Sequence, residues 1–123
     1  MKNILLVFFL FAIVIISCYY DSEENLYPVI TNNCDTTSVT FAGSIAPLLQ
    51  NNCLTCHSNN NAASQGGNIR LQNYADIYTK KTVILASINR MTGALPMPKG
   101  TAKLNICLIR QAEIWINNGA PNN

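Results

Sequence analysis

The sequence predicts a small helical domain that spans residues 34–123. Apolar residues recur three or four positions apart in three segments of this part, which is the spacing of one helix face. Serine or asparagine stands where each helix would begin, as is typical of N-caps. A chain of 123 residues holds one domain at most. A domain this small commonly needs a disulfide, metal or cofactor to supplement its core.

Residues 1–17 are predicted to be a secretory signal. Lys2 is followed by a run of 13 apolar residues, positions 4–16, which is shorter than the roughly 18 residues that a membrane-spanning helix needs. The ending Ile-Ile-Ser-Cys resembles a bacterial lipobox, which implies a lipoprotein whose first mature residue is lipidated Cys18. Ordinary signal cleavage nearby, with a free Cys18, is the alternative.

Residues 18–33 are expected to form an acidic, flexible tether, because they are polar and lack an apolar period. Removing residues 1–17 deletes Lys2 from the eight basic residues and none of the six acidic ones, so the mature net charge is +1. Such a slight charge gives no argument for a nucleic-acid partner.

The first predicted helix precedes the central cysteines. Its apolar positions are Ile45, Leu48 and Leu49. Ser44 is a candidate N-cap, and Pro47 falls in the first turn, where proline is tolerated. We expect this helix to lead directly into the cysteines.

A loop and a middle helical segment follow. Residues 59–68 are loop by composition, and Gly66 and Gly67 allow a close approach or a positive φ. The segment 74–91 has Asn73 as a candidate cap, and its apolar pattern predicts one broken helix or two short ones.

The last helix has the clearest pattern. Asn105 is its predicted cap, and Gly119 lies just past its end. Trp115 is expected to pack in the core. Cys107 lies at the start of this last helix, where it should face a segment near Cys34. The predicted apolar face consists of Leu108, Ala112, Trp115 and Ile116.

Five cysteines need a role, and few should stay unpaired in an exported protein. If Cys18 carries lipid and Cys53 acts together with Cys56, Cys34 and Cys107 remain as a possible disulfide. That bond would close a loop of about 70 residues and stabilise the fold by about 4 kcal/mol. The competing arrangement forms two disulfides from these four and leaves the only histidine unexplained.

Cys53, Cys56 and His57 form a CxxCH motif. In covalent haem attachment, two thiols spaced this way bond to the porphyrin, and the following histidine becomes the proximal iron ligand. Zinc would require two further ligands, and the remaining cysteines lack paired spacing. A thioredoxin-like dithiol would require a βαβ pattern, which is not visible.

A second axial ligand must come from methionine, because the chain has one histidine. Met97 lies between Pro96 and Pro98, which favour a stiff extended loop. Met91 lies at the end of a helical pattern, where we expect it to pack against the core. Met97 is therefore the predicted distal ligand, with Met91 and an open position as alternatives.

Together these segments resemble a small class I cytochrome c. More narrowly, "APLLQNNCLTCHS", "GGNIRLQNYADI", "MPKGTAKL" and "IWINNGAP" are similar to segments of Bacteroidetes lipoprotein cytochrome c domains. The resemblance covers residues 34–123. It implies an all-α fold wrapped around one covalent haem c, with thioether bonds to Cys53 and Cys56 and axial ligands His57 and Met97. Many relatives have Ser or Asp where this chain has Asn105 or Ile106, a difference that affects only helix capping.

The implied function is one-electron transfer between redox partner proteins on the periplasmic side of a bacterial membrane or at the cell surface, with the lipid on Cys18 as membrane anchor. Two rivals remain: a haem enzyme or gas sensor with an open distal site, and a disulfide-stapled binding module without haem. Four lysines could steer acidic partners or be ordinary solvated charges: Lys80, Lys81, Lys99 and Lys103.

Overall fold

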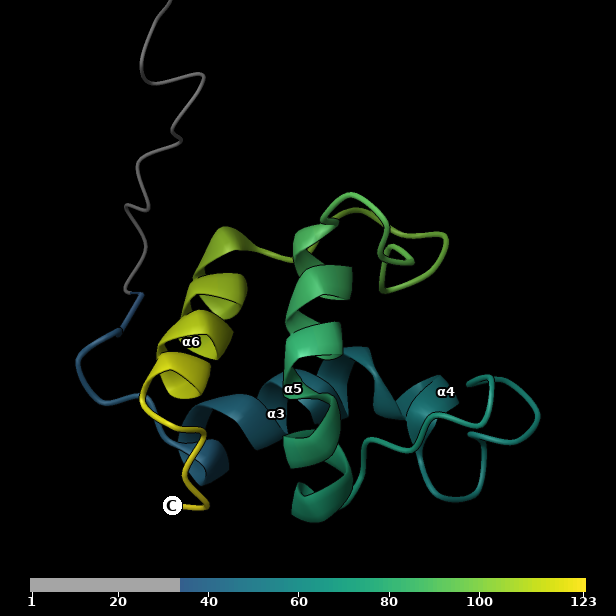
Figure 1. The fold of residues 1–123 in the computed structure, drawn as a ribbon, viewed down its shortest axis with the longest axis horizontal. Coiled ribbons are helices and arrows are strands. Elements are labelled where there is room, and N and C mark those ends of the chain that lie inside the picture. Colours follow the sequence, from purple (N-terminus) through teal and green to yellow (C-terminus); the bar gives the residue numbers. More distant parts are fainter. Residues whose placement is uncertain (1–33) are drawn as a thin grey trace, which may run out of the picture.

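The computed structural model of the chain describes residues 34–123 (Figure 1). The predicted signal at 1–17, lipidated Cys18 and tether at 18–33 lie outside the described residues. The described part is built from helices and loops without a strand, which confirms the expected helical class. None of the helices in this part combines the length and the apolar character that a membrane crossing requires.

The first helix begins earlier than predicted. A single π-helical turn, η1 (Phe41–Ile45), continues into α3 (Ala46–Asn52). Thr40 has an extended backbone, and its hydroxyl accepts a hydrogen bond from the Gly43 N–H at 3.0 Å. Thr40 is therefore the N-cap. The prediction of Ser44 as cap is wrong, because Ser44 already lies inside the first turn.

The middle segment forms one continuous helix, α5 (Tyr74–Asn89). The prediction of a broken helix or two short ones is wrong. Residues 79–82, whose polar side chains interrupt the apolar pattern, form one full turn of α5 in which no residue is fully buried, whereas Ile77 before them and Ile88 after them are buried. Arg90 ends α5 in the left-handed conformation with φ of 58°, a common way to stop a helix.

The last helix, α6 (Ile106–Asn117), begins as predicted. The Asn105 side chain accepts a hydrogen bond from the Cys107 N–H at 2.8 Å. The expected apolar face packs inward, and Trp115 is only 2% exposed, with its ring 5.8 Å from that of Phe41. The helices share one core, made of Ile45, Leu48, Leu49, Leu71, Ile77, Ile88, Ile109, Ala112, Trp115 and Ala120.

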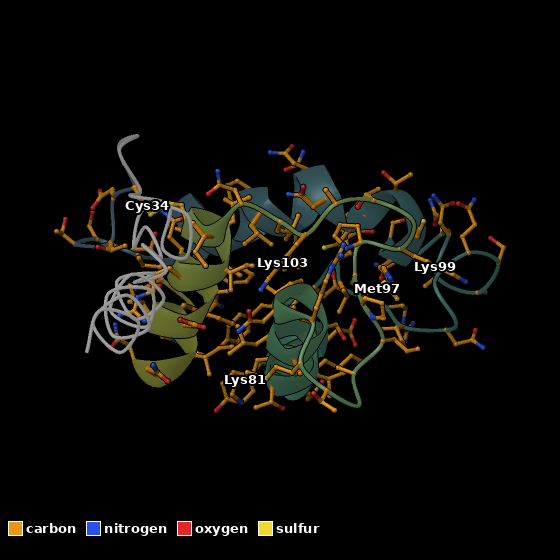
Figure 2. The ribbon with its side chains drawn as sticks, turned by 90° about the horizontal axis from the view of Figure 1, so that it is seen from above. Cys34, Lys81, Met97, Lys99 and Lys103 are labelled. Carbon is orange, nitrogen blue, oxygen red and sulfur yellow. A yellow bond between two sulfur atoms is a disulfide. The ribbon has the colours of Figure 1, made fainter. Side chains whose placement is uncertain are left out.

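The two sides of α5 are occupied by different parts of the chain. Figures 1 and 2 both show α6 on one side, and α4 (Leu54–His57) with the loop between α5 and α6 on the other. Helices α5 and α6 pack against the first helix, so the part of the molecule around the CxxCH motif consists of α4 and the two long loops that follow α4 and α5.

Candidate functional site

The CxxCH motif occupies a single helical turn. Cys53 lies at the junction between α3 and α4 and ends the first helix. Its carbonyl accepts hydrogen bonds from the Cys56 N–H at 3.2 Å and the His57 N–H at 2.9 Å. Residues three apart in such a turn lie on the same face, so Cys53 and Cys56 are neighbours. The turn stops at Ser58, whose backbone is extended.

His57 is held at two points by the loop that follows it. Its ring Nδ1 lies 2.9 Å from the Ile69 carbonyl oxygen, and its own carbonyl accepts from the Leu71 N–H at 2.8 Å. A carbonyl can only accept, so Nδ1 carries the ring proton. The other ring nitrogen, Nε2, then has a free lone pair in the neutral side chain, which is the state that ligates a metal.

The loop itself is folded tightly against the motif. The Asn61 side chain donates to the Thr55 carbonyl at 2.8 Å, and the Asn59 N–H donates to the Gln72 side chain at 3.0 Å. Ala62 is only 2% exposed, and its carbonyl accepts from both Gly66 and Asn68. The segment that composition identified only as a loop is therefore a hydrogen-bonded scaffold for His57.

Both motif cysteines have free thiols and are partly buried. Burial raises the pKa of the Cys53 thiol from an ordinary value of 9.0 to about 11. Burial therefore makes the Cys53 thiol less ionised than an ordinary cysteine at any given pH. A thioredoxin-like dithiol requires the opposite, a thiol with a lowered pKa.

Cys34 and Cys107 form a disulfide with their Cα atoms 5.6 Å apart, so the pairing expected from cysteine use is present. The Gln111 side chain, one turn along α6, also donates to the Asp35 carbonyl at 2.8 Å. The disulfide removes two of the cysteines that a four-ligand zinc site would need. Across residues 34–123, no three side chains of His, Cys, Asp or Glu are arranged to hold a metal ion together.

Met97 lies in the loop between α5 and α6. Its N–H is the one backbone donor in the Pro96–Met97–Pro98 triplet, because proline lacks an N–H, and it donates to the Ser87 carbonyl on α5 at 3.1 Å. The Arg90 guanidinium fastens the same loop by donating to the Thr101 carbonyl at 2.6 Å. Figure 2 shows Met97 on the side of α5 where α4 lies.

The structure brings Cys53, Cys56 and His57 together in one turn. Met97 comes from a separate loop, and within residues 34–123 no hydrogen bond joins that loop to α4. Met91 does not pack in the core as predicted. It is 49% exposed, and its N–H donates to the Ala86 carbonyl at the end of α5 at 2.9 Å.

Three of the four lysines, Lys81, Lys99 and Lys103, lie at separate places in the structure (Figure 2). Lys81 lies on α5 with its ammonium 3.7 Å above the Tyr78 ring, and Lys103 donates to the Asn89 side chain at 2.8 Å. Lys99 instead lies beside Met97 in the loop (Figure 2). The lysines that are described therefore make separate contacts within the fold.

The donor set present fits a c-type haem. Two free, adjacent thiols and a histidine whose Nε2 is available occur in the order that covalent attachment requires. Sequence reasoning missed the Ile69 carbonyl, because any residue supplies a carbonyl at that position. The Gly66–Gly67 pair was the one available signal. No family model, no curated protein and no solved structure matches this chain.

Proposed function

We propose that residues 34–123 form a monohaem c-type cytochrome domain that carries single electrons. When bound, the haem supplies a one-electron iron couple. Cys53 and Cys56 hold it through thioether bonds, which require both sulfurs to be unpaired, as they are. His57 and Met97 would bind its iron. The contact between His57 Nδ1 and the Ile69 carbonyl carries this proposal, because it leaves Nε2 free to bind.

Restraint of both ligands favours a carrier over an enzyme. The His57 backbone is fixed by Leu71 and its ring by Ile69, and the Met97 backbone is fixed to Ser87. Ligands held in place by their own chain rearrange little when a charge is added or removed. A thioether ligand also favours the reduced state and so raises the potential.

Location and partners follow from the sequence. The lipobox-like segment ending at Cys18 supports an exported bacterial lipoprotein, anchored in a membrane by lipid and exposed on the periplasmic side or at the cell surface. Its partners are other redox proteins.

Expression of the full chain with its signal, in a bacterium that matures c-type cytochromes, tests the proposal. Pyridine haemochrome analysis should show one haem per chain that resists acid-acetone extraction, and potentiometric titration should show a one-electron transition. The matched control is the Cys53→Ser/Cys56→Ser variant, which should carry no covalent haem. A colourless wild-type protein would exclude the cytochrome, and a haem protein that binds carbon monoxide readily when reduced would favour the open-site enzyme or sensor.

A further inference from the structure

The loop of residues 91–104, which carries Met97, is fastened to the last turn of α5. Figure 1 shows this loop leaving the end of α5, extending toward the side where α4 lies and returning to α6. The Met97 N–H donates to the Ser87 carbonyl at 3.1 Å. Further along the loop, the Thr101 carbonyl accepts from the Arg90 guanidinium at 2.6 Å. One turn of helix therefore holds the loop at two successive places.

Thr101 connects the Arg90 contact to the neighbourhood of Met97. Its hydroxyl donates to the Pro98 carbonyl at 3.2 Å, and Pro98 follows Met97 directly in the sequence. The guanidinium of Arg90 thus reaches the residue beside Met97 through a single intervening side chain. Loss of the guanidinium would release Thr101 from α5 and leave the Ser87 contact to hold this part of the loop.

Arg90 occupies a position where glycine is the usual residue. Its φ is 58°, in the left-handed region that strains any residue with a Cβ. The other long helix, α6, is followed by Gly119, whose φ is 88°. Glycine would end α5 equally well and without strain. A side chain held in a strained backbone conformation calls for a role of its own, and here that side chain bonds to the loop that carries Met97.

We propose that Arg90 is a positioning residue for Met97. Its guanidinium holds the Thr101 carbonyl, and the Thr101 hydroxyl holds Pro98, so the loop keeps Met97 in one place beside α5. This inference rests on the proposed function for its effect on iron, because Met97 is the predicted distal ligand. Release of the loop should make Met97 easier to displace and leave the covalent attachment of haem intact.

Arg90→Gly separates the side chain from the end of the helix. Glycine adopts the left-handed conformation without strain, so α5 should still end at residue 90 while the hydrogen bond to Thr101 is lost. The net contribution of a hydrogen bond from a charged donor corresponds to roughly a tenfold change in an equilibrium constant. Cyanide, which must displace Met97 from oxidised iron, should therefore bind about tenfold more tightly to Arg90→Gly than to the wild type.

Arg110→Ala is the matched control. Arg110 pairs with Glu113 within α6 at 3.2 Å, so the loss of its guanidinium should leave the cyanide affinity at the wild-type value. An unchanged affinity in Arg90→Gly, as expected if Arg90 served only to end α5, would overturn the proposal. An equal increase in Arg90→Gly and Arg110→Ala would overturn it as well.

Thr101→Ala tests the connection to Pro98 without altering the end of α5. It removes the hydroxyl that bonds to the Pro98 carbonyl and keeps the carbonyl that accepts from Arg90. The cyanide affinity should rise several-fold, by less than in Arg90→Gly. A wild-type affinity in Thr101→Ala would overturn the proposed connection through this side chain.

Amide hydrogen exchange of the full-length protein measures the loop directly, whether or not haem is attached. The Met97 N–H, which bonds to Ser87, should exchange about tenfold faster in Arg90→Gly than in the wild type. Equal exchange in the two proteins would overturn the positioning role of Arg90. A colourless wild-type protein would instead defeat the proposed function and leave the exchange result standing.

Discussion

The Cys34–Cys107 disulfide should account for a large part of the stability of this domain. The two residues are 73 positions apart. In the chain-entropy model, closing a loop of that length lowers the entropy of the unfolded state enough to stabilise the fold by about 4 kcal/mol. Small domains are stabilised by only about 5–15 kcal/mol in total. The Cys34→Ser/Cys107→Ser variant should therefore lose a substantial fraction of its stability.

Equilibrium unfolding in urea, followed by far-ultraviolet circular dichroism, measures this loss. Gln111→Ala is the control, because it removes the hydrogen bond to Asp35 beside the disulfide and leaves the disulfide intact. That exposed hydrogen bond should contribute no more than about 1 kcal/mol. A loss below about 1 kcal/mol in the double-serine variant would refute the loop-closure reasoning. If the Cys34→Ser/Cys107→Ser variant failed to attach haem covalently, the conclusion that Cys34 and Cys107 take no part in haem attachment would be refuted.

Three further predictions concern single residues. Met97→Ala should abolish the methionine-to-iron absorption band of the oxidised protein. Met91→Ala should retain the band, because Met91 is 49% exposed at the end of α5. Loss of the band in Met91→Ala and its retention in Met97→Ala would instead make Met91 the iron ligand. In the haem-free chain, Cys53 should react slowly with iodoacetamide at pH 8, because burial raises its pKa to about 11. The rate of this alkylation should rise as the pH approaches 11. Fast alkylation at pH 8, mapped to Cys53 by mass spectrometry, would contradict the burial of this thiol. Asn105→Ala should destabilise the fold by about 1 kcal/mol in urea unfolding through loss of the α6 cap, and an unchanged midpoint would show that the cap contributes nothing.

Parts of the fold whose signals are local were predictable from the sequence. The start of α6 followed from Asn105, whose side chain caps the helix, and the buried positions Leu48 and Leu49 followed from their spacing. The continuity of α5 was not predicted, because the polar residues 79–82 break the apolar pattern without breaking the helix. The N-cap was placed at Ser44 rather than Thr40, because both residue types cap well and a π-helical turn shifts the start.

The residues of the candidate site could be identified from the sequence, but the contacts that hold them in place could not. Spacing alone identified the two cysteines and His57 of the motif. The Ile69 carbonyl is invisible in sequence, because the backbone acceptor is the same for every residue. The sequence also makes no distinction between Gly66 and Gly67: only the fold shows that a Cβ at Gly66 would lie 2.6 Å from the Cys56 carbonyl oxygen, whereas a Cβ at Gly67 would meet no atom within 4 Å.

The covalent bond between the chain and a haem is the central claim, and mass spectrometry of the exported protein measures it directly. The intact mature chain should be heavier by the mass of one haem, and peptide mapping should place that mass on the segment containing Cys53, Cys56 and His57. A chain without added mass, whose two motif cysteines are recovered as free thiols or as a disulfide with each other, would contradict the claim.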